Sequence, residues 1–205
     1  MKSELGISHG LTLIETLVTI FIFTLIMGVV VGFIIMAYQV HGYTWQQSMA
    51  IDEARKGIET MVKEIREAKS GADGSYPIEK AEDFQFIFYS DIDQDLAVER
   101  VRYFVQGTDF KKGVIDPTGW PIEYDSENEE IFTLSQYVRN EATPVFTYYN
   151  KDWPGDIINN PLPTPARLKE TKLMEVYLRV NVDPNRPPQN FDLESFVQIR
   201  NLKEE

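Results

Sequence analysis

The stretch GLTLIETLVTIFIFTLIMGVVVGFIIMAY, residues 10–38, decides the N-terminal part of the fold. It contains a single carboxylate, Glu15, and the 22 residues from Thr16 to Ala37 carry no charge. About 20 apolar residues in a helix, each rising about 1.5 Å, cross the roughly 30 Å hydrocarbon core of a bilayer. The stretch therefore predicts a transmembrane helix over residues 11–38.

Glu15 is the unusual residue of this stretch because it stands where the apolar run begins. An ionised carboxylate in or near hydrocarbon is costly, so it needs a partner or a function. Taken alone, the position fits either a side chain in the headgroup zone or a functional carboxylate.

The residues GLTLIE (10–15), followed by a long apolar helix, resemble the processing motif of type IV prepilins and type II secretion pseudopilins. The resemblance implies that a prepilin peptidase cuts between Gly10 and Leu11 and methylates the new amine of Leu11. It also implies that Glu15 pairs with such an amine, from the same chain or a neighbour, during assembly. Leu11 replaces the phenylalanine more usual after the cut, and the leader carries Glu4 beside its single lysine, Lys2.

The sequence after the apolar run predicts that the helix continues to about residue 70, since no proline interrupts it. Over residues 44–70, apolar residues recur every three or four positions and mark one buried face. They are Ile51, Ala54, Ile58, Met61, Val62, Ile65 and Ala68. Gly28 and Gly32 form a GxxxG pattern, which indicates either ordinary tolerance of glycine or close packing between membrane helices.

The remainder, residues 71–205, reads as strands separated by turns. The clearest strand alternates apolar Met174, Val176, Leu178, Val180 and Val182 with more polar residues, as a strand with one buried face does. No helix-length amphipathic run separates the strands, so antiparallel pairing is expected. The predicted strands are 84–89, 98–105, 130–134, 145–149, 174–182 and 191–200, and the predicted long loops are 153–166 and 183–190, the second joining the last two strands.

Composition limits the classes of function. The chain has no cysteine, its two histidines are His9 and His41, and its net charge is −12. Residues 70–205 carry −11 of that charge, which disfavours nucleic-acid binding because phosphate contacts need a basic face. The absence of Cys and His from this region excludes Ser-His-Asp and Cys-His catalysis there. We expect neither an enzyme nor a cofactor.

One acidic run is a weak candidate for a metal site. Asp91, Asp93 and Asp95 have the spacing of the first three ligands of a calcium loop. Leu96 then stands where that loop needs glycine, and Arg102 stands where it needs an acid. A hairpin turn between strands 84–89 and 98–105 explains the run as well, because aspartate favours turns.

These observations predict an α+β, type IV pilin-like fold: leader 1–10, long helix 11–70 and an exported antiparallel β domain 71–205. The resemblance implies a minor pilin or pseudopilin, similar to the J and W types over residues 84–105 and 191–203. The partners it implies are prepilin peptidase, other pilins and the cytoplasmic membrane, with the C-terminal domain outside the cytoplasm. Two alternatives remain: a secretion-system pseudopilin that binds exported substrate, and a single-pass anchored binding module that never enters a filament.

Overall fold

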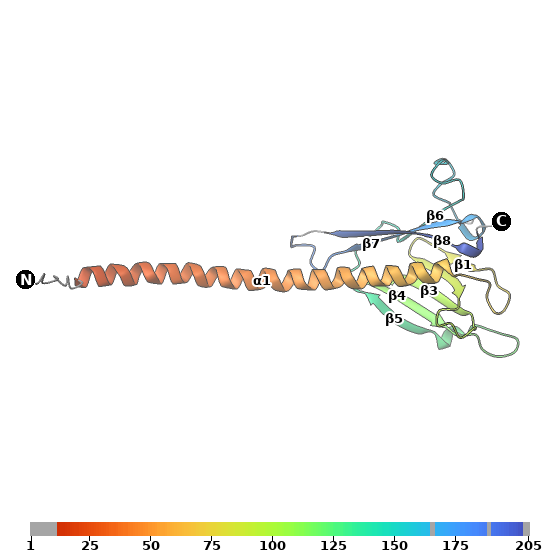
Figure 1. Cartoon of the computed structure of the whole chain (residues 1–205), viewed down its shortest axis with the longest axis horizontal. Coiled ribbons are helices and arrows are strands. Elements are labelled where there is room, and N and C mark those ends of the chain that lie inside the picture. The colour runs from red at the N-terminus through yellow and green to blue at the C-terminus, as the bar shows by residue number, and fades with distance from the viewer. Residues whose placement is uncertain (1–11, 165–166, 188–189, 203–205) are drawn as a thin grey trace, which may run out of the picture. The chain divides into compact units, whose positions relative to one another are not determined.

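The computed structural model describes residues 12–164, 167–187 and 190–202 (Figure 1). The chain forms two compact units, Met1–Trp45 and Gln46–Glu205, and each is considered by itself below. The helices are α1 (Leu13–Arg66), α2 (Arg167–Glu170), and the short 3₁₀ turns η1 (Ser126–Asn128) and η2 (Arg200–Leu202). The strands are β1 (Ile78–Ala81), β2 (Gln85–Ser90), β3 (Glu99–Gln106), β4 (Asp109–Ile115), β5 (Glu130–Ser135), β6 (Phe146–Tyr149), β7 (Leu173–Val180) and β8 (Phe191–Gln198).

The described part of the first unit is the apolar first part of α1. Between Leu13 and Tyr38 its large apolar side chains lie exposed, by 43% at Val30 and up to 83% at Leu13, whereas Tyr43 is buried. By length and composition this segment can cross a membrane, and no other helix in the described residues can. The length and composition of this helix therefore support the transmembrane helix expected from the sequence.

The second unit contains two antiparallel sheets. Strands β1 to β5 form one sheet in chain order, and β6, β7 and β8 form the other, also in chain order. Every pairing is antiparallel, as expected from the absence of crossover helices. All six strands predicted from the sequence are present, and the loop 183–190 joins β7 to β8 as expected. β1 and β4 were not predicted.

The core of the second unit lies between the sheets and the C-terminal part of α1. Ile58, Met61 and Ile65 of α1 belong to one buried cluster with residues from both sheets. Near the start of the unit, Ala50 and Ala54 meet Val180 of β7. The apolar stripe predicted on the helix is thus its buried face. Aromatic rings fill the centre of the cluster, where Phe86, Phe88, Tyr103, Phe110, Phe146 and Tyr148 are less than 2% exposed.

Polar contacts tie α1 to the larger sheet. Glu64 accepts hydrogen bonds of 2.6 Å from Lys112 Nζ of β4 and from Tyr103 Oη of β3. The Lys112–Glu64 ion pair is largely buried, with both side chains 11% exposed. Burial first, and the charge of Glu64 second, raise the pKa of the Tyr103 hydroxyl, so it remains a donor. This triad fixes the position of the helix against the sheet.

The helix ends at Arg66, earlier than the expected residue 70. The amide of Ala68 turns back to the carbonyl of Ile65, which tightens the last turn. The next amide, that of Lys69, donates to the carbonyl of Tyr89 in β2, so the main chain has joined the sheet. The result is an α+β, type IV pilin-like architecture, in which a long N-terminal helix packs its C-terminal part on antiparallel β-sheets.

Candidate functional site

The first candidate site is the N-terminus of α1. Gly10 and Leu11, the predicted cleavage residues, lie outside the described residues. Thr12 precedes the helix and Glu15 stands in its first turn. The Glu15 carboxylate accepts hydrogen bonds from the Thr12 amide, at 2.8 Å, and from the Thr12 hydroxyl, at 2.9 Å. The Glu15 amide donates to the Thr12 hydroxyl at 3.4 Å.

This arrangement is a capping box, in which the residue before the helix and the third helical residue satisfy each other's amides. Glu15 was predicted to act through its charge, and its capping role was not predicted. The signal was present as Thr12-x-x-Glu15 before an apolar run. Chemically, the carboxylate accepts hydrogen bonds from two donors at the position where the helix begins.

Gly28 and Gly32 lie one turn apart on α1, in the apolar segment. A methyl group added at either glycine would meet no atom within 4 Å other than the helix's own backbone. The surface beside both glycines is open to a neighbouring helix. Their role in helix packing stays a prediction.

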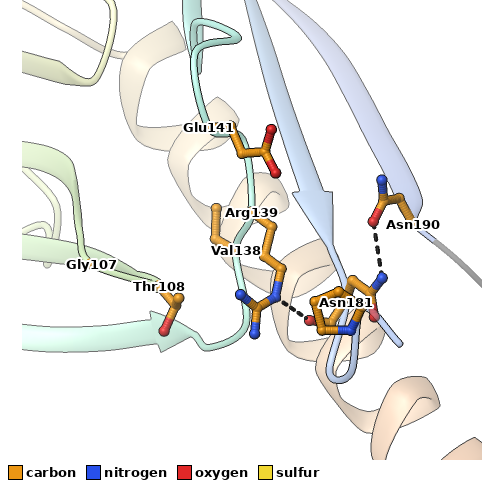
Figure 2. A pocket seen from close by; sticks show the side chains of 8 residues that line it. Gly107, Thr108, Val138, Arg139, Glu141, Asn181 and Asn190 are labelled. Carbon is orange, nitrogen blue, oxygen red and sulfur yellow. Dashed lines mark hydrogen bonds between the residues drawn. The ribbon is translucent and has the colours of Figure 1, made fainter. Parts of the chain in front are cut away.

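A second candidate site is a cavity of about 380 Å³ in the second unit. It opens where the β3–β4 turn, the β5–β6 linker and the β7–β8 loop meet (Figure 2). Its wall is a mixture of polar and apolar groups, and the polar ones come from Thr108, Arg139, Glu141, Asn181 and Asn190. This cavity was not predicted from the sequence, because its residues come from three segments far apart in the chain.

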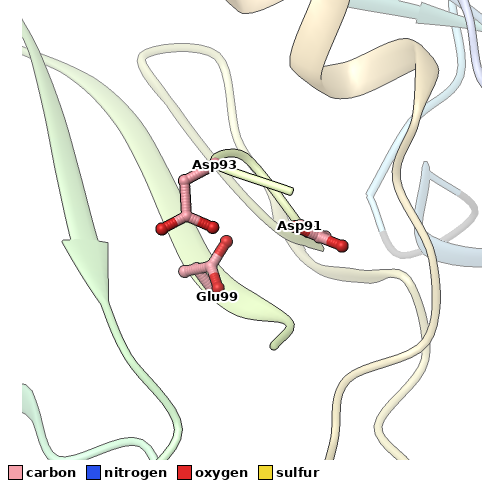
Figure 3. Close-up of side chains that lie close together, drawn as sticks. All are labelled: Asp91, Asp93 and Glu99. Atoms are coloured by element: carbon pink, nitrogen blue, oxygen red, sulfur yellow. The ribbon is translucent and has the colours of Figure 1, made fainter. Parts of the chain in front are cut away.

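The third candidate is the acidic loop between β2 and β3. The carboxylates of Asp91, Asp93 and Glu99 offer one oxygen each within 4.8 Å of one another. Figure 3 shows Asp93 and Glu99 side by side, with Asp91 on the neighbouring turn. Asp95 lies outside this group and accepts from the amide of Ala97 at 2.7 Å. The structure thus brings together two of the three predicted aspartates and adds Glu99.

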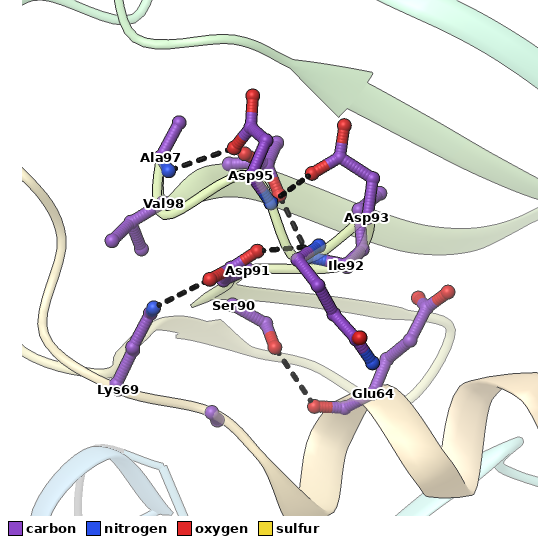
Figure 4. Close-up of polar contacts among 12 residues, drawn as sticks. Glu64, Lys69, Ser90, Asp91, Ile92, Asp93, Asp95, Ala97 and Val98 are labelled. Carbon is purple, nitrogen blue, oxygen red and sulfur yellow. Dashed lines mark hydrogen bonds and ion pairs between the residues drawn. The ribbon is translucent and has the colours of Figure 1, made fainter.

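Internal donors already occupy much of this loop (Figure 4). Asp91 pairs with Lys69 Nζ at 3.2 Å and accepts from the Gln94 amide at 2.8 Å. Glu99 accepts from the Ile92 amide at 2.8 Å. A hard cation such as calcium takes six to eight oxygen ligands, about twice what three monodentate carboxylates supply. The loop can attract a cation, but its hydrogen bonds account for its geometry without one.

Glu99 is the one buried carboxylate of the acidic loop, at 3% exposure. Burial, followed by the charges of Asp93 and Asp91, raises the pKa of Glu99, although the Ile92 amide opposes this. Leu96, at the position where a calcium loop has glycine, has a φ of +80° and an 87% exposed side chain. The backbone there adopts a conformation for which glycine is the usual residue.

Comparison with known proteins gives no match to this chain, either among protein-family models or among curated proteins.

Proposed function

We propose that this protein is a minor pilin or pseudopilin subunit. In this role the leader is removed by a prepilin peptidase at Gly10, and the α1 helix then carries the β unit into a filament. The observation that carries the proposal is the carboxylate of Glu15, five residues after Gly10, at the start of the apolar helix. The pilin-like fold described above supports the same role.

The contacts of Glu15 suit the proposed pairing with an amine. Its carboxylate already binds the amide of Thr12, the residue that follows Leu11 in the chain. An amine created at Leu11 would be separated from the Thr12 amide by a single residue along the chain. In the low dielectric of packed apolar helices, an ammonium competes well against the neutral amide and hydroxyl donors of Thr12.

The apolar segment supports a coarser statement of location. One helix near the N-terminus is long and apolar enough to span a membrane. We propose that it anchors the precursor in the cytoplasmic membrane, with the β unit on the outer side. Other pilins and the peptidase are the proposed partners, and the role needs no catalytic group or cofactor in this chain.

Mass spectrometry of the N-terminus tests the proposal. In a host with active prepilin peptidase, we expect the chain to begin at a methylated Leu11. Gly10→Arg should leave the precursor intact, because a long side chain obstructs close approach of the backbone to the peptidase. Gly6→Arg places the same residue in the same leader and should still be processed. An intact Met1 in the parent chain, with a known prepilin cut in the same cells, would exclude the proposal.

A second candidate is a single-pass anchored binding module, because the apolar helix alone accounts for membrane attachment. The two candidate functions predict different effects of removing the carboxylate of Glu15. Glu15→Ala leaves an anchor's membrane partners unchanged, whereas it removes a filament subunit from sheared filaments. Quantifying the parent and variant chains in the membrane and sheared fractions separates the two.

A further inference from the structure

The cavity of Figure 2 contains two opposite charges that do not pair with each other. Arg139 is half-buried and Glu141 is exposed, and both belong to the linker between β5 and β6. Among the described residues, no carboxylate lies within 4 Å of the Arg139 guanidinium. A ligand can therefore find both charges available.

Arg139 differs from the other arginines that lie in the sheets or in the loops between strands, although Arg55, Arg66 and Arg200 of the same unit also have no carboxylate within 4 Å among the described residues. The other arginines of the sheets and of the loops between strands are each bonded to a carboxylate. These are Arg100 with Glu79, Arg102 with Glu129, Arg167 with Asp83, Arg179 with Asp192 and Arg186 with Asp183. Carboxylates outnumber basic groups in the chain, 32 to 20, so a shortage of acids is not the reason.

One hydrogen bond anchors the guanidinium of Arg139. Its Nε donates to the carbonyl of Asn181 at 2.9 Å, and no described acceptor bonds to its two terminal nitrogens (Figure 2). Its main-chain amide donates to the carbonyl of Arg179 at 2.7 Å. The planar guanidinium presents its remaining donors in a fork that fits a carboxylate or a phosphate.

The segment that carries both charges is itself well held. The Val138 amide bonds to the Thr108 carbonyl at 2.8 Å, and Asn140 bonds to the main chain of β7 at Tyr177 and Arg179. Tyr137 and Glu141, at its two ends, have φ values of +62° and +52°. Residues other than glycine rarely adopt this backbone conformation, and the surrounding contacts maintain it here.

We propose that this cavity binds a small zwitterionic group, with its anion on the guanidinium of Arg139 and its ammonium on the carboxylate of Glu141. Thr108 and the amide nitrogen of Asn190 are further polar groups on the wall, and the Asn190 oxygen already accepts from Asn181 at 2.9 Å. A volume of about 380 Å³ is in the range of small-molecule sites, roughly 300–1,000 Å³. The anion is a carboxylate or a phosphate, and the inference does not depend on the proposed function.

Isothermal titration calorimetry of the full chain in an uncharged maltoside detergent tests this assignment. The probes are glycine, for an amino carboxylate, and O-phosphoethanolamine, for an amino phosphate. Acetate and ethylammonium carry one charge each and serve as comparators. We expect saturable binding of at least one zwitterion, about tenfold tighter than either comparator, because only the zwitterion pairs both charges. Which zwitterion binds identifies the anion.

Charge-removing variants locate the site. Arg139→Gln should weaken binding about tenfold and Glu141→Gln about threefold, since solvent screens the half-buried Arg139 less than the exposed Glu141. Arg55→Gln and Glu59→Gln remove the same charges from the exposed face of α1 and should change affinity less than about twofold. Arg139→Lys keeps the charge without the fork, and its affinity should lie between those of Arg139→Gln and the parent.

Two results would overturn the assignment. The first is no saturable heat with either zwitterion on the parent chain, a result that requires no variant to fold. The second is unchanged zwitterion affinity in Arg139→Gln, when its thermal unfolding matches that of the parent.

Discussion

At the scale of single residues, Glu99 links the acidic loop to stability. Its pKa is raised, mainly by burial, so the folded chain binds this proton more tightly than the unfolded chain does. The charged form therefore destabilises the fold above the folded pKa, and the penalty disappears below the unfolded pKa of about 4.3.

Glu99→Gln should accordingly stabilise the second unit at neutral pH. Glutamine keeps an oxygen for the Ile92 amide and removes the buried charge. We expect the unfolding midpoint to rise by about 1–3 °C at pH 7.5, the shift that up to ~1 kcal/mol produces in a domain of this size. The gain should shrink as the pH falls toward 4. Near-ultraviolet circular dichroism of the buried aromatic rings provides the measurement.

Glu79 provides a control of opposite sign. Burial raises its pKa, but hydrogen bonds from Arg100 and Tyr89 outweigh this and lower it overall. Its charged form stabilises the fold above the unfolded pKa, so Glu79→Gln should lower the midpoint at pH 7.5 and lose its effect in acid. If the two variants shift the midpoint in the same direction at pH 7.5, the charge argument for Glu99 is wrong.

Sequence reasoning could reach some single residues and not others. The motif Thr12-x-x-Glu15 is local, so the cap on α1 was readable from the printed sequence. Glu99 joins the acidic loop only through the register that pairs it with Ser90 across β2 and β3. Arg139 gains its place in the cavity only through contacts with the distant β3–β4 turn and β7–β8 loop. Such groupings require the tertiary structure.

At the scale of elements, the packing of β5 on α1 depends on a glycine. A Cβ at Gly57 of the helix would lie 3.2 Å from Leu134 Cβ of β5, so strand and helix approach closely there. Leu134 is itself half-buried beside Phe110 and other core residues. A Cβ at this position requires Leu134 to give way slightly, and a larger side chain must displace the strand.

Gly57→Leu should destabilise the second unit by about 1–3 kcal/mol, the usual cost of overpacking a core. In Gly57→Ala the cost of one methyl group is opposed by a helix-propensity gain of about 1 kcal/mol, so the net change should be small. Urea denaturation followed by near-ultraviolet circular dichroism measures both. Arg55→Leu, on the exposed face of the same helix, is the matched control and should change stability little. Equal stability of Gly57→Leu and Arg55→Leu would show that β5 does not pack here.

The strands that were predicted from the sequence differ from those that were missed in how regularly apolar residues occupy their inward-facing positions. β7 was predicted because Met174, Val176, Leu178 and Val180 are all apolar and all buried. β4 was missed because one of its inward residues is Lys112, whose charge is satisfied by Glu64 of α1. A charged residue at a buried position breaks the alternating pattern, and only the tertiary partner explains it. β1 has four residues, too few for alternation to be distinctive.

At the scale of the whole molecule, the second unit has a core of its own. Every residue of its two buried clusters lies between Ala50 and Leu202. A chain beginning at Gln46 should therefore fold without the apolar segment, remain in solution without detergent, and unfold cooperatively with a midpoint within about 5 °C of the full chain. Gel filtration and thermal circular dichroism measure this.

A shorter chain beginning at Glu67 serves as the contrast. It lacks the helix residues Ala54, Ile58, Met61 and Ile65, which fill the core between the sheets. It should show no cooperative transition and should aggregate, because the buried faces of both sheets become exposed. Cooperative unfolding of this fragment would mean that the helix is dispensable for the core.

The order of helix and strands along the chain was easier to predict from the sequence than the contacts that these elements make in the folded protein. Hydropathy and periodicity predicted the long helix and the antiparallel sheet region, because both patterns are local in the chain. The division of the strands into two sheets depends on which of them meet across the helix, and no local pattern records that. For the same reason, the cavity that three distant segments form could not be predicted from the sequence.

The hydrogen bond from Gln47 to the carbonyl of Val180 joins two residues that the ribosome adds at well-separated times. The two residues are 133 positions apart, and a ribosome adding about 5–20 residues per second needs roughly 7–27 s to make the chain between them. Throughout that interval the part of the helix that meets β7, at Ala50 and Ala54, has no strand to cover it. The nascent polypeptide is therefore exposed to premature association, and a chaperone that shields this part of the helix during translation would raise the yield of correctly folded protein.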